Sequence, residues 1–354
     1  KALIRRGYEP VRGPEILKSA VWKLSGHYAN YGENMYFTTI DEVEYGIKPM
    51  NCIGHIKVYQ STLRSYRDLP LRFYEYGVVH RHEKSGVLHG LLRVREFTQD
   101  DAHIFCSPSQ IGEEVQNIID FTKKIMNSFG FCYEMEISTR PAKSIGEDSI
   151  WEESTRALEN ALNHCGIKYT IDEGGGAFYG PKIDIKITDA IGRKWQCGTI
   201  QIDMNLPERF KLEYTSVENV SEQPVMIHRA IFGSFERFAA ILTEHFGGEF
   251  PFFIAPTQVI IIPIYECCNI YAKEIREKLL EIGVYAEIDV KNETLNKRIR
   301  NAEKQRVPMI IVLGEKELQE QKVALRDRRS KERSVLEVDQ FIQLAKEKMY
   351  EVDF

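Results

Sequence analysis

Two strands joined by a tight turn, over residues 182–204, most constrain the fold of this chain. In "KIDIKITDAIGRKWQCGTIQIDM", Ile183, Ile185 and Ile187 alternate with polar residues, and "DAIGR" supplies a turn between two such runs. Alternation with a period of two is typical of a strand with one buried face, and a short Gly-containing connection joins antiparallel neighbours. The sequence has neither a GxGxxG nor a GxxxxGK[ST] motif, and no parallel Rossmann pattern. We therefore expect an antiparallel sheet in the first part of the chain.

The pattern changes after "HFGGEFPFFIAP" (245–256), where Gly and Pro surround aromatic residues, as at a domain boundary. Before it, helical spacing of apolar residues predicts long helices over 109–130 and 148–166. After it, strands and helices alternate, which favours a small α/β domain. The predicted fold class is α/β: an α+β domain at 1–250, with an antiparallel sheet flanked by helices, and a smaller domain at 256–354 with a mixed sheet. In that smaller domain we expect strands at 258–264, 284–290, 307–314 and 322–329, and helices at 269–283, 295–305 and 335–349.

Composition excludes several classes of protein. A hydrophobic content of 43% with no apolar run near ~18 residues leaves no membrane-spanning segment. The seven Cys have no disulfide-framework spacing, which fits a reducing cytoplasm. A net charge of −5 argues against indiscriminate nucleic-acid binding, but residues 291–333 hold 13 Lys/Arg against 7 Asp/Glu. That excess is either a solvated face or a docking surface for nucleic acid.

Because the chain starts without Met or an apolar signal, we expect it to be the interior of a longer protein.

The segment "REFTQDDAHIFC" (95–106) has strand spacing but an unusual polar face. Phe97, Gln99, Asp101, His103 and Phe105 share one side of such a strand. A strand with one solvated face is the plain interpretation, but strand interiors usually avoid Asp. The row therefore predicts a binding site.

Arginine residues flank a Gly-containing loop just before that strand. Arg81 ends one predicted strand, with Glu83 two residues on, and Arg93 and Arg95 stand on the returning strand. A guanidinium is a planar fork of donors suited to phosphate. One Arg alone is more often a surface residue, but this arrangement of strand, loop and strand favours a phosphate site. The Gly-rich run at 173–182 is a weaker candidate, because no helix follows it directly.

Longer stretches resemble the class II aminoacyl-tRNA synthetases, and specifically the threonyl-tRNA synthetase family. "GYEPVRGPEIL", "VVHRHEKSGVLHGLLRVREFTQDDAHIFC" and "IHRAIFGSFERF" resemble the three class motifs. "KPMNCIGH" and "FYGPKID…WQCGTIQID" are similar to segments of the threonine-specific enzymes. The resemblance covers the whole chain and implies a catalytic and an anticodon-binding domain, with the N-terminal domains of the family absent.

The resemblance implies one catalytic zinc per chain, held by Cys52, His103 and His228. One thiolate and two imidazoles are zinc ligands, and three protein ligands leave a fourth position for substrate. Taken singly, each of these residues is more often a packed Cys or a hydrogen-bonded His. The implied role of zinc is to select threonine through its amino and hydroxyl groups.

Further roles follow from the same resemblance. The implied threonine contacts are Met50, Gln99, Asp101, Tyr179, Lys182, Gln201 and Ser234. The implied ATP contacts are Arg81, Glu83, Arg93, Phe97, Gln196, Thr199 and Arg237. Arg81, Arg237 and Lys182 are expected to serve catalysis, and His27 to help take a proton from the tRNA. Asn292, Glu317 and Arg326 match positions that read the anticodon. Strict alternation separates Gln196 from Gln201, so we expect a bulge near Gly198.

The implied function is that of a threonine–tRNA ligase, using threonine, ATP with Mg²⁺, and threonine tRNA. A cytoplasmic homodimer with no membrane partner is expected, with its subunit interface around "GYEPVRGPEIL". A prolyl- or seryl-tRNA synthetase is the alternative within the class, and the Cys-His-His set argues against it. A catalytically inactive paralogue is the alternative outside it, and the retained Arg81, Glu83 and Arg237 argue against that.

Overall fold

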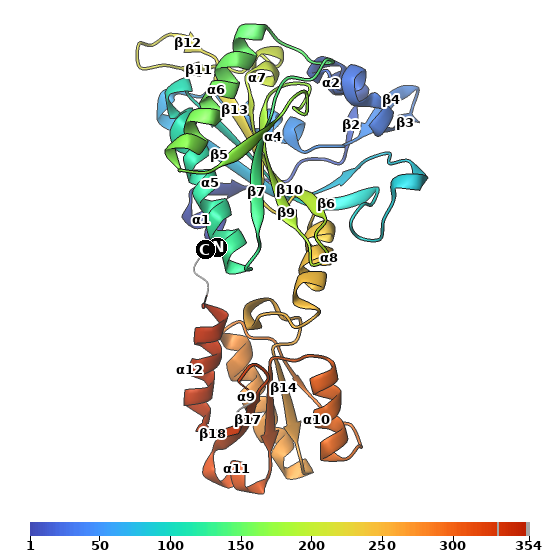
Figure 1. Ribbon diagram of the computed structural model, residues 1–354, viewed down its shortest axis with the longest axis vertical. Coiled ribbons are helices and arrows are strands. Elements are labelled where there is room, and N and C mark those ends of the chain that lie inside the picture. The colour runs from blue at the N-terminus through green and yellow to red at the C-terminus, as the bar shows by residue number, and fades with distance from the viewer. Residues whose placement is uncertain (331–332, 352–354) are drawn as a thin grey trace. The chain divides into compact units, whose positions relative to one another are not determined.

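The computed structural model describes residues 1–330 and 333–351, and it divides into two compact units (Figure 1). The first unit is Lys1–Ile241 and the second begins at Leu242. None of the helices in the described part of the chain combines the length and apolarity needed to cross a bilayer.

An eight-stranded sheet forms the centre of the first unit, in the order β1-β5-β6-β13-β10-β9-β7-β8. The pairs at its two edges, β1–β5 and β7–β8, are parallel, and every pair between them is antiparallel. The strands are β1 Tyr8–Pro10, β5 Leu71–His80, β6 Glu96–Cys106, β13 Val225–Ala230, β10 Lys194–Asp203, β9 Lys182–Thr188, β7 Tyr133–Ser138 and β8 Tyr169–Asp172. The predicted antiparallel hairpin is the pair β9–β10.

Two long helices, α5 (Ile111–Ser128) and α6 (Asp148–His164), lie side by side across this sheet (Figure 1). Their buried residues recur every three or four positions, as in Ile111, Val115 and Ile118 of α5, which makes one apolar stripe on each helix. On β9, Ile183, Ile185 and Ile187 are fully buried on the face opposite Lys182 and Lys186. The helices therefore cover the apolar face of the sheet and leave the polar face for a site.

Shorter elements complete the first unit. A three-stranded sheet has the order β2-β4-β3, and β11 pairs with β12. The strands are β2 Ile16–Lys18, β3 Tyr36–Ile40, β4 Val43–Ile47, β11 Tyr214–Thr215 and β12 Ser221–Glu222. The helices are α1 Ala2–Arg5, α2 Ser19–Ser25, α3 His27–Tyr31, α4 Cys52–Tyr59 and α7 Asn205–Arg209, with 3₁₀ turns at Gly32–Asn34, Tyr66–Asp68, Ser85–Val87 and Pro108–Gln110. The helix α8 (Phe235–Phe246) begins in the first unit and ends in the second.

The second unit is a mixed five-stranded sheet between helices, in the order β15-β14-β16-β17-β18. The strands β15, β14 and β16 are parallel, and β17 and β18 are antiparallel additions. One face packs on α9 and α12 around Ile261, Ile311 and Phe341, and the other packs on α10 around Ile260 and Ile310. The elements are β14 Val259–Pro263, β15 Ala286–Ile288, β16 Met309–Leu313, β17 Lys322–Asp327, β18 Arg333–Glu337, α9 Asn269–Glu281, α10 Leu295–Lys304, α11 Glu315–Glu320 and α12 Val338–Met349, with 3₁₀ turns at Phe252–Ile254 and Glu266–Cys268.

The predicted fold class is confirmed, with one local correction. The last helix was expected from Val335, but Val335 and Leu336 belong to β18, and the helix starts at Val338. Leu336 lies opposite Val323 of β17, so pairing with that strand overrides the local helical spacing.

Candidate active site

One row of polar side chains runs straight across four strands of the large sheet. His103 of β6 pairs with His228 of β13, which pairs with Gln201 of β10, which pairs with Lys182 of β9. Directly opposed residues on neighbouring strands point to the same face. Antiparallel pairing therefore brings four residues from distant parts of the sequence into one line on the face that α5 and α6 leave open.

A cavity of about 510 Å³ covers this row. Residues from β6, β9, β10 and β13 line it, together with the loops after β5 and before α4. The predicted zinc, threonine and ATP residues that line it are Met50, Cys52, Arg81, Glu83, Arg93, Phe97, Gln99, Asp101, His103, Tyr179, Lys182, Gln196, Thr199, Gln201, His228, Ser234 and Arg237. Their roles stay predictions, but the fold gathers all of them.

A bulge in β10 contributes to this gathering. The register of β10 against β9 shifts between Gln196 and Gly198, at the position expected for it. Gly198 is required there, because an added Cβ would lie 2.9 Å from the backbone oxygen of Ile231. Gln196 and Gln201 consequently both line the cavity.

Arginine side chains crowd one end of the cavity. The Arg81 guanidinium lies 5.1 Å from the centre of the Phe97 ring, and Arg81 Nε donates to the Pro49 carbonyl at 3.2 Å. Arg237 donates to the carbonyls of Leu92 and Gln196, both at 2.8 Å. Their mutual repulsion is unfavourable without an anion between them, so this end is suited to phosphate.

Glu83 and Arg93 pair with each other at the mouth of the same end. Glu83 Oε2 accepts from Arg93 Nη2 at 2.9 Å and from Nε at 3.1 Å. Both residues lie in the loop between β5 and β6. Because β6 starts at Glu96, Arg93 and Arg95 precede the returning strand and were wrongly predicted to lie on it. The pair orders this loop over the cavity.

The other end of the cavity is built around acids and amides. Asp101, which is 8% exposed, accepts from Asn51 Nδ2 at 2.9 Å, and burial raises its pKa. Tyr179 donates to Gln201 Oε1 at 2.6 Å, and Lys182 Nζ lies 2.7 Å from Asp184. Asp101 Oδ1 lies 3.8 Å from His103 Nε2. A buried carboxylate without a Lys or Arg partner is suited to a ligand's ammonium group.

His103 and His228 face each other below these groups. His103 Nε2 lies 2.9 Å from His228 Nδ1, and the outer nitrogens contact other buried groups: His228 Nε2 lies 2.9 Å from Asp203 Oδ2, and His103 Nδ1 lies 2.7 Å from His55 Nδ1. Burial, and then the charges of His55, His228 and Arg229, lower the pKa of His103, so its ring is neutral.

Cys52 is buried at the start of α4 and lies 3.8 Å from His27 Nε2. Burial raises the pKa of its thiol, with a further contribution from Asp101 and Asp203. Over residues 1–330 and 333–351 as they stand, no three His, Cys, Asp or Glu side chains are grouped as a metal centre.

His27 does not line the cavity. It is fully buried at the first position of α3, with Nδ1 2.8 Å from Ser25 Oγ. Burial, followed by the charges of His228, Arg81 and Arg209, lowers its pKa to about 3. The ring is therefore neutral and stands behind Cys52.

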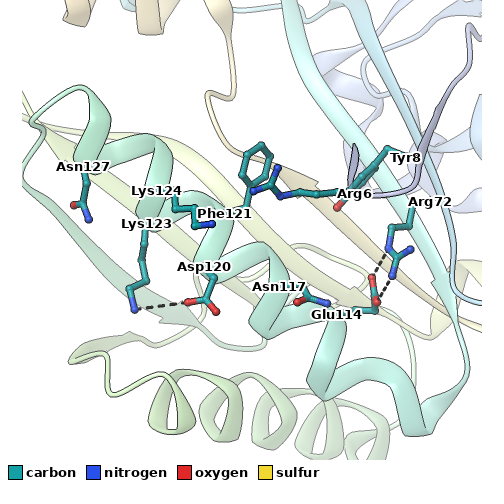
Figure 2. Close-up of a pocket in the computed structure, with 10 residues that line it drawn as sticks. All are labelled: Arg6, Tyr8, Arg72, Glu114, Asn117, Asp120, Phe121, Lys123, Lys124 and Asn127. Atoms are coloured by element: carbon teal, nitrogen blue, oxygen red, sulfur yellow. Dashed lines mark hydrogen bonds and ion pairs between the residues drawn. The ribbon is translucent and has the colours of Figure 1, made fainter. Parts of the chain in front are cut away.

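A second cavity, of about 620 Å³, lies between α1, β1, β5 and α5 (Figure 2). Several of its charged groups have partners: Arg72 pairs with Glu114 through two hydrogen bonds, Lys123 lies 3.7 Å from Asp120, and Arg6 lies 4.0 Å from the centre of the Phe121 ring. None of the predicted site residues lines it.

The predicted anticodon residues occupy different parts of the second unit. Asn292 follows β15 and is exposed, Glu317 lies in α11, and Arg326 lies on β17 opposite Ile310. Glu317 Oε2 also accepts from the Gly314 N–H at 2.9 Å, which caps α11.

Part of the basic stretch at 291–333 is structural. Arg298 is 5% exposed and donates to the Pro263 carbonyl at 2.9 Å, and Arg328 donates to the Phe250 carbonyl at 2.8 Å. Lys291, Lys297 and Arg300 are exposed. The positive charge that a ligand can reach is thus smaller than the number of Lys and Arg residues in this stretch suggests.

Sequence reasoning missed Asn51, His55, Asp184 and Asp203, all of which contact predicted site residues. For His55 a signal existed, because residues three apart on a helix share a face, so the Cys52-x-x-His55 spacing directs both toward the site. For Asp203 the partner is non-local, and no local pattern indicates it.

Comparisons with known proteins agree with this geometry. Residues 36–246 match the family model of the tRNA synthetase class II core domain (G, H, P, S and T), and residues 258–348 match that of the anticodon binding domain. The whole chain is 70% identical to the threonine--tRNA ligase of Campylobacter lari and 71% identical to that of Helicobacter hepaticus, and it spans 59% of the length of each.

Among solved structures, one described as the RNA binding domain of threonyl-tRNA synthetase from Cryptosporidium parvum Iowa II superposes with a TM-score of 0.94. It is 42% identical, and the match covers 99% of this chain and 88% of that one. The chain therefore belongs to the class II aminoacyl-tRNA synthetases, and among them to the threonyl-tRNA synthetase family.

Proposed function

We propose that the protein is a threonine–tRNA ligase. It joins threonine to ATP, giving threonyl-adenylate and pyrophosphate, and passes the threonyl group to the 3′ end of threonine tRNA. The observation that carries this proposal is the line of His103, His228, Gln201 and Lys182 under a cavity with arginines at one end. Further support comes from the two bacterial relatives, which are named threonine--tRNA ligase and of which the chain spans 59% of the length.

Activation needs a carboxylate and the α-phosphate of ATP to meet in one orientation. Arg81 and Arg237 would hold the phosphates, and their guanidinium groups would stabilise the charge that spreads over the phosphate oxygens. Lys182 would hold the threonine carboxylate, and Asp101 would hold its ammonium group. Mg²⁺ accompanies ATP and is expected to neutralise further phosphate charge.

Cys52, His103 and His228 are the residues that would hold a zinc ion. The donor set, one cysteine sulfur and two imidazole nitrogens, fits zinc. In support, His103 Nε2 and His228 Nδ1 point at each other from 2.9 Å, and the other ring nitrogens are held by His55 and Asp203. Such outer contacts are usual for histidine ligands. When bound, zinc would supply an electrophile that discriminates a hydroxyl from a methyl group.

The main consequence of a zinc ion at this site would be selection of threonine over valine. A site built to bind a hydroxyl rejects the analogue lacking it by ~10⁴ or more. Serine has both the amino and hydroxyl groups and lacks one methyl, which is worth only about 10–200-fold.

The second unit is proposed to read the anticodon through Asn292, Glu317 and Arg326, with exposed lysines and arginines of 291–333 on the RNA backbone.

A cytoplasmic homodimer is proposed, with the subunit interface around residues 7–17. Sedimentation that shows a stable monomer at micromolar concentration would contradict the dimer.

Charging of threonine tRNA tests the proposal. Arg81→Ala and Arg237→Ala are each expected to lower threonine-dependent ATP–pyrophosphate exchange by ~10² or more. Arg156→Ala, at an exposed position of α6 that does not line the cavity, is the control and should leave exchange unchanged. Equal activity in all three variants would mean that Arg81 and Arg237 do not bind the phosphates of ATP.

A further inference from the structure

Three histidines and an aspartate form a continuous line of close polar contacts under the cavity. Asp203 Oδ2 lies 2.9 Å from His228 Nε2, His228 Nδ1 lies 2.9 Å from His103 Nε2, and His103 Nδ1 lies 2.7 Å from His55 Nδ1. The three imidazoles are at most 5% exposed. His103 thus contacts a histidine through each of its ring nitrogens, and His55 ends the line.

Glu75 stands behind that end. His55 Nε2 has no hydrogen-bond partner among the described residues and lies 3.9 Å from Glu75 Oε2. Glu75 is held as a carboxylate by Lys48 Nζ at 2.8 Å and by the Gly13 N–H at 2.7 Å. Burial alone would raise the pKa of Glu75, but the interactions with His55, Lys48 and Gly13 outweigh it and lower the pKa to about 2.

The line can hold its protons in two ways. In the first, His55 Nδ1–H donates to His103, His103 Nε2–H donates to His228, and His228 Nε2–H donates to Asp203. A lone pair of His55 then faces the Glu75 carboxylate, which is unfavourable. In the second, His55 carries its proton on Nε2, toward Glu75, and accepts from His103 Nδ1–H.

Both arrangements contain the same number of protons, so changing from one to the other releases none. Only the second frees the Nε2 lone pair of His103, and it leaves that lone pair directed at the Nδ1 lone pair of His228. Asp101 Oδ1 also lies 3.8 Å from His103 Nε2. The two lone pairs and the Asp101 carboxylate repel one another unless a cation lies between them. The second arrangement is therefore the one that binds a metal, and Glu75 favours it by attracting the His55 N–H.

We infer that His55 is a positioning residue, which holds His103 in the metal-binding tautomer through its acceptor Nδ1, with Glu75 fixing the proton of His55. The inference rests on the proposed zinc site and adds to it two residues that do not touch the ion. Outer partners of this kind typically contribute 10–100-fold to metal affinity.

Four variants of the whole chain separate this role from packing. His55→Leu removes the acceptor and keeps an apolar side chain of similar size. His55→Asn restores an oxygen acceptor close to the position of Nδ1. Glu75→Gln removes the charge behind His55. Phe73→Leu is the packing control, because the buried Phe73 ring meets His55 edge-on, with 6.3 Å between ring centres, and contributes no polar group.

Zinc affinity, measured by competition with a chelator, and the visible spectrum of the cobalt-loaded protein are the readouts. The expected result is a 10–100-fold loss of zinc affinity with an altered cobalt spectrum in His55→Leu, a smaller loss in Glu75→Gln, and near wild-type values in His55→Asn and Phe73→Leu.

If the wild-type chain binds zinc tightly and His55→Leu binds it equally well, the inference is wrong and the zinc proposal stands. The inference is also wrong if zinc affinity falls equally in His55→Leu, His55→Asn and Phe73→Leu. Such a result would mean that His55 acts only through its packing. If the wild-type chain takes up no zinc, both the zinc site and the role of His55 are wrong.

Discussion

Gln196 and Gln201 lie five positions apart on β10, yet both side chains face the same cavity. An odd separation places two residues on opposite faces of a regular strand. The register shift between Gln196 and Gly198 adds one residue against β9 and returns both to one face. The bulge therefore lets one strand supply both ends of the cavity.

Gly198→Ala should destabilise the protein and disturb this arrangement. The new Cβ would lie 2.7 Å from Ile185 Cδ1 and 2.9 Å from the Ile231 carbonyl oxygen. The Ile231 backbone would have to move to relieve this contact. We expect a loss of roughly 1–3 kcal/mol in the free energy of unfolding, measured by urea titration, and weaker amino-acid activation. Gly112→Ala, whose Cβ would meet nothing within 4 Å, is the control. Equal stability of the two variants would mean that β10 accommodates a side chain at the bulge.

Asp101→Asn should weaken amino-acid binding. Asp101 is buried beside Asn51, so losing its charge leaves a ligand ammonium group without an anionic partner. Removing one member of a buried charge pair costs about 2–5 kcal/mol, which is roughly 30-fold or more in KM for threonine. The KM for ATP in the same variant serves as the internal control. If both constants rise together, Asp101 supports the fold of the cavity and does not contact the amino acid.

Glu75 should make stability depend on pH in the acid range. Its pKa in the folded protein, about 2, lies below its ordinary value, so the folded state is favoured at pH above ~4.3 and loses that advantage as pH falls toward 2. The difference in unfolding free energy between wild type and Glu75→Gln should therefore be largest above pH 5 and shrink below it. A difference that stays constant from pH 7 to pH 3 would contradict the ionised Glu75–Lys48 pair.

Arg326→Ala should reduce charging of threonine tRNA and leave ATP–pyrophosphate exchange nearly unchanged. Arg326 lies on β17 in the second unit, and the proposed adenylate site lies in the first. Lys346→Ala, an exposed charge change on α12 of the same unit, is the control and should affect neither assay. Equal losses in both assays for Arg326→Ala would indicate a structural role for this residue.

Local spacing predicted much of this fold and of the candidate site. Alternation predicted β6, β9 and the polar face of the sheet, and the mismatch of Gln196 and Gln201 predicted the bulge. Resemblance to a family supplied the residues that the cavity brings together.

The contacts that support those residues were not predicted. The Cys52-x-x-His55 spacing indicates the face of α4 on which His55 lies, but not its contact with His103. Asp203 contacts His228 through strand pairing, and β18 forms because β17 offers an edge. Such contacts depend on tertiary structure, which local propensity and spacing do not encode.

ATP–pyrophosphate exchange with the purified, zinc-loaded chain and a series of amino acids shows which amino acid the protein activates. Threonine should give the highest kcat/KM, with serine lower by about 10–200-fold and valine by ~10⁴ or more, and proline should give no exchange above background. Exchange that does not depend on threonine, or that proline or valine supports equally well, would contradict the proposed function.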